Sequence, residues 1–163
     1  IYDIHLLANF PALNPDPAVQ EKIDAVIAYL LHPDYQSLED GYGIMSAGPR
    51  KFYAVGWSVH LPGYFGDLEH HRWRQAFVQR MVLMSHFQLA RQHPWFQDGL
   101  AYRESFRTDA GTYLFPRSML RESPSGYWVA GAYMGLEENR RSKKALELES
   151  TFWMLKIIDW REI

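Results

Sequence analysis

The chain has 163 residues, of which 47% are hydrophobic, 15% aromatic and 22% charged, enough for one domain with its own core rather than a disordered chain. It contains no cysteine, which excludes disulfides, thiolate metal ligands and a cysteine nucleophile. A net charge of −2 and a pI of about 6.4 argue against nucleic acid as a partner. The sequence has no Gly-rich phosphate-binding or dinucleotide-binding motif, so no cofactor is predicted.

The first thirteen residues do not resemble a signal peptide, because Asp3, His5, Asn9 and Pro11 interrupt the apolar residues. No apolar run approaches the ~20 residues of a membrane span. We therefore expect a cytoplasmic protein without a membrane span. The chain begins at Ile1 rather than Met, so one interpretation is that 1–163 is the C-terminal part of a longer chain.

The first predicted helix covers 17–31. Asp16 can accept hydrogen bonds from free backbone N–H groups, and Pro17 suits the first helical position. The helix should end before Pro33, because the residue before a proline avoids helical angles. Its apolar residues recur at helical spacing: Val19, Ile23, Val26, Ile27, Leu30 and Leu31.

The residues after Asp40-Gly41 are predicted to be extended. Residues 42–46 and 51–57, separated by Gly48-Pro49, read as a β-hairpin or as two extended arms. Pro62-Gly63 ends this region. A long helix is then expected over 67–92, with Asp67 as its cap and an apolar stripe through Phe77, Met81 and Phe87. Pro94 should begin a shorter helix.

Two further extended segments are predicted over 109–115 and 127–133, with a turn at 123–126 between them. A final helix is predicted over 142–159. Leu148, Phe152 and Leu155 mark one apolar line on it, and Leu146, Trp153 and Ile157 mark another. A helix apolar over so much of its circumference is expected to be well buried.

The two halves of the chain resemble each other. Each contains a helix, an Asp and a Gly, an extended arm and adjacent aromatic residues, so that 52–57 in the first half corresponds to 127–133 in the second. Such self-similarity is typical of repeated helical hairpins with inserted loops, and chance clustering of aromatic residues is the alternative. The expected fold class is mainly α, with helical hairpins and short β-hairpin or extended loop insertions in a single domain.

The segment 146–157, with Ser150 and Trp153 entering a Leu-rich helix, resembles the last inner helix of α/α-toroid proteins of the terpenoid cyclase and prenyltransferase-like group. Asp40-Gly41-Tyr42 is similar to the repeat loops of that group. The resemblance covers about a third of the chain and implies a partial α/α toroid-like scaffold more than a reaction. The sequence lacks the cysteine zinc ligand of protein prenyltransferases and the aspartate-rich motif of the triterpene cyclases.

Three clusters of polar residues suggest chemistry. Asp67, His70 and His71 have the spacing to share one helical face as metal ligands, but acidic residues at a helix start usually face solvent, so no metal site is predicted. His60, among aromatic residues, is either a general acid or base or a buried structural histidine. The basic block 140–144 can hold a phosphate or, as its two preceding glutamates favour, form a solvated loop.

Glu149 falls near the apolar stripe of the last helix, where a buried carboxylate would need a cation or a raised pKa. Two hypotheses for function follow. The first is a helical scaffold with an aromatic-lined groove that binds an apolar or sugar-like ligand, or a partner protein, through Tyr53, Trp57, Tyr127, Trp128 and Tyr133. The second is a fragment of a toroid-type enzyme acting on a polyprenyl or carbohydrate substrate, in which His60, Asp40 and Glu149 transfer protons.

Overall fold

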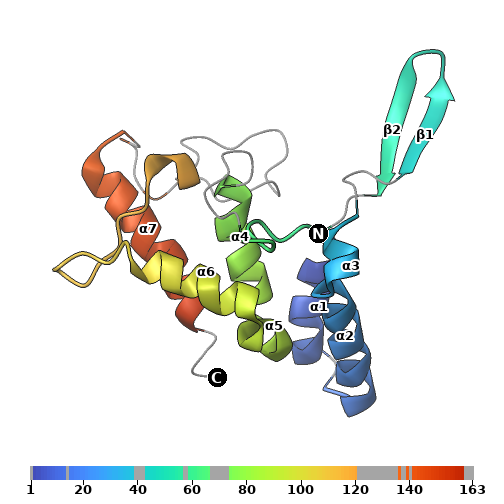
Figure 1. Ribbon diagram of the computed structural model, residues 1–163, viewed down its shortest axis with the longest axis horizontal. Helices are drawn as coiled ribbons and strands as arrows, with labels where there is room; N and C mark the ends of the chain where they lie inside the picture. Colours follow the sequence, from blue (N-terminus) through green and yellow to red (C-terminus); the bar gives the residue numbers. More distant parts are fainter. Residues whose placement is uncertain are drawn as a thin grey trace. The chain divides into compact units, whose positions relative to one another are not determined.

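Helices dominate the computed structural model, as the sequence predicts. It describes residues 2–13, 15–38, 43–56, 59–66, 74–120, 136, 139 and 141–159, with the backbone alone at 2, 12, 43–45, 52–56 and 74–76. In chain order the elements are α1 (Tyr2–Leu13), α2 (Pro17–Leu30), α3 (Pro33–Gln36), β1 (Gly43–Gly48), β2 (Lys51–Gly56), α4 (Arg74–Met84), α5 (Gln88–Gln92), α6 (Pro94–Glu104), the 3-10 helix η1 (Arg117–Met119) and α7 (Lys143–Ile158) (Figure 1).

The chain divides into two compact units, Ile1–Leu61 and Pro62–Ile163. Each is described by itself. The single domain expected over 1–163 stays a prediction.

In the first unit α2 contacts both α1 and α3. The predicted start of α2 is confirmed, since Asp16 is its N-cap and accepts a hydrogen bond from the Ala18 N–H at 2.9 Å. Its buried residues are Ile23, Ile27 and Leu30, whereas Val26 is exposed. The sequence assigned no element to the first thirteen residues, and α1 occupies them with Pro11 inside the helix. Pro11 lies in its last turn, where the helix is about to end.

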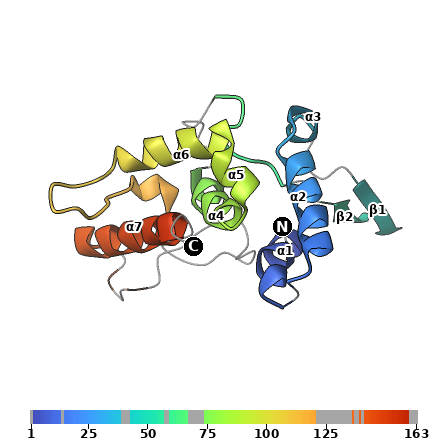
Figure 2. The same ribbon diagram turned by 90° about the horizontal axis from the view of Figure 1, so that it is seen from below.

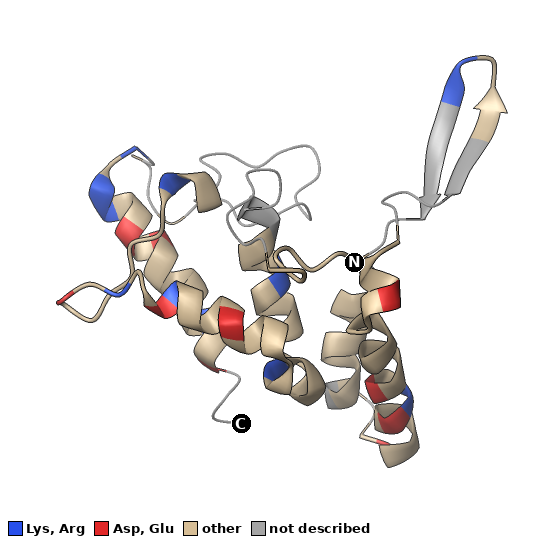
Figure 3. Ribbon diagram, in the orientation of Figure 1, with Lys and Arg blue, Asp and Glu red and all other residues tan. Residues whose placement is uncertain are grey.

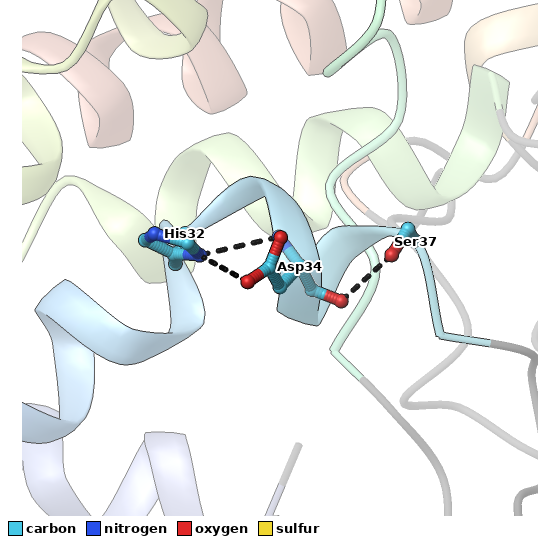
Figure 4. Close-up of polar contacts among 3 residues, drawn as sticks. All are labelled: His32, Asp34 and Ser37. Atoms are coloured by element: carbon cyan, nitrogen blue, oxygen red, sulfur yellow. Dashed lines mark hydrogen bonds and ion pairs between the residues drawn. The ribbon is translucent and has the colours of Figure 1, made fainter.

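The short helix α3 is held at both ends by side chains. His32 Nδ1 accepts a hydrogen bond from the Asp34 N–H at 3.2 Å, and Ser37 Oγ donates to the Asp34 carbonyl at 2.8 Å (Figure 4). The buried Gln36 amide at its end donates to the carbonyls of Leu30 and Val59 and accepts from the Leu61 N–H. Gln36 therefore fixes the segment 59–61 to the end of α2.

The region read as a hairpin or two arms contains the antiparallel pair β1–β2, with Met45 opposite Tyr53. Gly48 pairs with Lys51, so the turn is Pro49-Arg50, and Arg50 has a φ of 62°. A proline followed by a left-handed residue is the geometry of a type II turn, which explains the tight reversal.

The single helix expected over 67–92 is wrong in its second half, because α4 ends at Met84 and α5 begins at Gln88. Phe87 is extended, with φ −109° and ψ 124°. The Ser85 carbonyl accepts from Arg91 Nη1 at 3.0 Å, and the Ser85 hydroxyl donates to the Val82 carbonyl at 2.7 Å. These hydrogen bonds give partners to the backbone carbonyls at the break between the two helices. The sequence did not reveal this break, because the apolar residues continue at helical spacing across it. Residues 67–73 lie outside the described part.

In the second unit α4 contacts α6, η1 and α7, and Figure 2 shows α6 and α7 beside it. The predicted starts at Pro94 and Ser142 are confirmed by α6 and α7. The expected extended segment 109–115 forms one bridge, Arg107 with Tyr113. Its backbone is held instead by hydroxyls of α7, since the Phe115 N–H donates to Ser150 Oγ and the Tyr113 N–H to Thr151 Oγ1, both at 3.0 Å.

Charges of both signs occur together on α2 and on α7 (Figure 3). Among the described residues no helix combines the length and the apolar character that crossing a membrane would take.

Candidate functional site

Most residues predicted to form a binding site lie outside the described residues. These are Asp40, Trp57, Tyr127, Trp128 and Tyr133, together with the metal candidates Asp67, His70 and His71. Tyr53 lies in β2, where the backbone alone is described. The predicted aromatic-lined groove therefore stays a prediction.

His60 is half-buried in the first unit, between the buried residues Val59 and Leu61. The Val59 N–H donates to the Tyr35 hydroxyl at 3.0 Å, and both neighbours of His60 are bound to Gln36. The backbone around His60 is therefore held firmly in place, as suits a structural histidine as well as an acid or base.

Glu149 is buried, with 2% of its surface exposed, on the face of α7 that lies against the rest of the second unit. Its Oε1 accepts a hydrogen bond from the Leu136 N–H at 2.5 Å. Glu149 and His60 belong to different units, so the structure defines no distance between them.

Metal binding finds no support within the described ranges, where no group of three or more His, Asp or Glu side chains could hold an ion. In the basic block, Lys143 and Lys144 are exposed in the first turn of α7. This exposure fits the solvated alternative.

The residue with the most unusual surroundings is Arg103, near the end of α6. Its side chain is fully buried, at 0% exposure. The guanidinium carbon lies 4.7 Å from the centre of the Phe77 ring of α4 and 4.4 Å from that of Phe115. Among the described residues, none accepts a hydrogen bond from its nitrogens Nε, Nη1 and Nη2. Arg103 is thus a buried cation held by aromatic faces.

Burial lowers the pKa of Arg103 to about 9, and the nearby Tyr102 offsets a part of this effect. The side chain remains a cation at neutral pH. Buried charges are normally paired and hydrogen-bonded, because an uncompensated ion costs several kcal/mol. Arg103 therefore combines a positive charge, three nitrogens whose N–H groups have no acceptor among the described residues, and apolar surroundings.

Sequence reasoning missed Arg103, because Tyr102-Arg103-Glu104 looks like an ordinary polar helix end. The signal was its spacing. Phe96, Gly99, Leu100 and Arg103 stand at positions i, i+3, i+4 and i+7, which places the arginine on the apolar face of α6.

The described aromatic residues mainly build the core of the second unit. Phe77, Trp95, Phe96 and Phe115 are all buried. Trp95 pairs edge to face with Phe77 at 6.1 Å and with Phe96 at 6.3 Å, and Phe115 pairs in the same way with Phe106 at 6.0 Å. For these residues the alternative of an aromatic core is the one observed.

A second ring cluster lies where the chain enters α6. The Tyr64 ring stacks on His93 at 5.5 Å, and Trp95 Nε1 donates to the Pro62 carbonyl at 2.8 Å. His93 Nδ1 accepts from the Trp95 N–H and caps α6. Burial lowers the pKa of His93 and raises that of Tyr64.

The expectation that α7 is buried around its circumference is wrong for one face. Leu146, Met154 and Ile157 are buried, but Leu148 is 39%, Phe152 37% and Leu155 53% exposed. Lys156 Nζ lies 5.6 Å from the centre of the Phe152 ring. The three exposed side chains, called here the α7 apolar line, follow the spacing i, i+4, i+7 and so share one side of the helix.

Comparisons of the chain with protein-family models, with curated proteins and with solved structures find no match.

Proposed function

We propose that this chain is a helical binding module that docks onto a partner protein through the α7 apolar line. The single observation that carries this is the exposure of Leu148, Phe152 and Leu155 on one side of a helix whose opposite side is buried. Apolar side chains that are exposed singly are normal, whereas a contiguous patch marks an interaction surface.

The spacing of the line suits a protein partner. Side chains at i, i+4 and i+7 are the anchors that a helix places into an apolar groove. Full burial of a Leu or Phe side chain contributes ~1.5–3 kcal/mol, so covering the exposed half of these three offers about 3 kcal/mol in all. Stable binding needs more than this, and the proposal assigns the remainder to the aromatic-rich loops.

In this proposal Tyr53, Trp57, Tyr127, Trp128 and Tyr133 contact the partner, or an apolar or sugar-like group on it. The support is the aromatic enrichment of Gly- and Pro-rich segments, where binding residues concentrate. Replacing Trp57 and Trp128 together by alanine should weaken binding and leave the helices folded. Unchanged affinity of this double variant would remove the loops from the site.

The test of the α7 apolar line is photo-crosslinking in cells that express the chain. A photoreactive residue replaces Phe152, and a matched control replaces Leu89, which is 38% exposed on α5 of the same unit. We expect one discrete crosslinked partner from position 152, lost when Leu148 and Leu155 are changed to serine. Equal labelling from both positions would contradict the proposal.

A fragment of a toroid-type enzyme is the second candidate, with helical hairpins in a partial α/α toroid and a polyprenyl or carbohydrate substrate. The observation that favours it is the burial of the Glu149 carboxylate. His60 and Asp40 would be its companions in proton transfer. Glu149→Gln keeps an acceptor for the Leu136 N–H, so it should preserve folding and abolish turnover. Turnover that survives this change would exclude Glu149 as the acid.

A further inference from the structure

We propose that Arg103 is a binding site for the carboxylate of an apolar acid. The inference goes beyond docking on the α7 apolar line and does not rest on it. It rests on the packing of α6 against α4, on the missing acceptors of the guanidinium and on the apolar side chains around it.

The close approach of α6 to α4 places the aromatic ring under the arginine. A Cβ atom at Gly99, one turn before Arg103, would lie 2.9 Å from both Met81 Sδ and Phe77 Cζ. Glycine is therefore what lets the two helices come this near. Phe77 thereby reaches the guanidinium, while Phe115 contributes the second ring.

The described carboxylates of this unit that are at least partly buried have donors of their own. Glu104 accepts from the Tyr113 hydroxyl at 3.0 Å, Glu147 from the Thr112 hydroxyl and Glu149 from the Leu136 N–H. None of them bonds to Arg103, whose three nitrogens have no acceptor. The guanidinium thus holds a bidentate donor edge that nothing in the described chain uses.

The rings of Phe77 and Phe115 compensate for a part of the hydration that the Arg103 guanidinium loses on burial. A cation–π contact involves the faces of the guanidinium and leaves its in-plane N–H groups without an acceptor. A buried donor without an acceptor destabilises the folded chain, and a charged donor does so more strongly. A group this costly persists when it serves binding, as perturbed charges in functional sites do.

The surroundings define the ligand. A guanidinium matches a planar carboxylate through two parallel hydrogen bonds. A single cation balances one negative charge, which favours a carboxylate over a phosphate dianion. Phe77, Met81 and Phe115 offer apolar contact to the body of the acid. The nitrogens are closed to solvent, so the acid enters by displacing side chains that cover them.

Titration of the whole chain with decanoate tests the proposal, using decanol, acetate and inorganic phosphate as comparison compounds. We expect decanoate to raise the unfolding temperature and to bind at least about tenfold more tightly than decanol, because only the carboxylate can accept charge-assisted hydrogen bonds from the guanidinium. Arg103→Met should remove this preference, and Arg107→Met, at an exposed position in the same unit, should keep it.

A second measurement needs no destabilising change at the site. In the unchanged chain, the arginine side-chain N–H signal that Arg103→Lys removes should shift on adding decanoate. The proposal is overturned if that signal does not move, if decanol binds as well as decanoate, or if Arg103→Met binds both as before. Binding of inorganic phosphate alone would also overturn it and would indicate a simple anion site.

Discussion

Replacing Arg103 by methionine should make the chain more stable when no ligand is present. The change removes a buried cation that lacks acceptors and keeps an unbranched apolar side chain in its place. Most substitutions of fully buried side chains reduce the free energy of unfolding, so an increase is a distinctive outcome.

The magnitude follows from the two opposing effects. At ~1.4 kcal/mol for each pKa unit, the fall of the Arg103 pKa to about 9 corresponds to about 5 kcal/mol against the charged form. Losing the contacts with Phe77 and Phe115 costs ~1–2 kcal/mol each. The net expectation is a free energy of unfolding higher by about 2 kcal/mol.

Urea denaturation at neutral pH measures this difference. Arg107→Met is the control, and as an exposed substitution it should stay within about 0.5 kcal/mol of the unchanged chain. Arg103→Lys keeps the charge without the planar stack and should be less stable than the methionine variant. A methionine variant less stable than the unchanged chain would refute the reasoning, since the guanidinium would then be stabilised by more than its ring contacts.

The sign of the pH dependence gives the same prediction a second check. The folded pKa of Arg103 is lower than the unfolded one, so between about 9 and the unfolded pKa the unfolded chain binds more protons. The contribution of this group to stability is therefore fully present only above the unfolded pKa and is lost as the pH falls through about 9. Relative to Arg103→Met, the unchanged chain should gain stability as the pH rises above 9.

Three further predictions concern the framework. Gly99→Ala should lower the free energy of unfolding by ~1–3 kcal/mol in urea denaturation, because the added methyl group overpacks against Met81 and Phe77. As a control, Ala101→Gly, at an exposed position of α6, should lower it by about 1 kcal/mol through helix propensity alone. Gln36→Leu should leave the Leu61 N–H and the Val59 carbonyl unpaired, and hydrogen exchange at residues 59–61 should rise about tenfold or more. Unchanged exchange there would show that Gln36 does not hold the segment. Burial lowers the pKa of His93, so the contribution of His93 to the free energy of unfolding is full above pH 6.5 and is lost as the pH falls below it. His93→Asn keeps a helix cap and should flatten this part of the curve of stability against pH. An unchanged curve would show that His93 does not cause the pH dependence.

Local signals in the sequence predicted the helix starts well. Asp16 before Pro17, the proline at 94 and Ser142 act through atoms two or three residues away, so the sequence nearby is sufficient. The break at Ser85–Phe87 could not be found in this way, because Met81, Met84 and Phe87 continue the helical spacing. After α4 the Ser85 carbonyl accepts from the Arg91 side chain, a contact that the spacing of apolar residues does not reveal.

The candidate sites depend on which faces are covered, and apolar spacing alone does not decide that. Both lines of α7 are apolar in the sequence, yet one lies against the second unit and the other is exposed. Arg103 became notable only once Phe77 and Phe115 were seen to surround it. Burial of Glu149 was posed as an open question by the sequence, and the structure shows the carboxylate buried, with the Leu136 N–H donating to it.

The two threonines that close the loop after α6 have a practical consequence. The Thr108 N–H donates to the Thr112 carbonyl at 2.8 Å, and their hydroxyls lie 2.7 Å apart, so the base of the loop is clamped while Asp109, Ala110 and Gly111 are exposed. Chain added at such a tip is tolerated, because the flanking backbone is already tied down. An epitope tag or a fluorescent reporter inserted after Ala110 would therefore give a handle on the intact protein without touching α7 or Arg103.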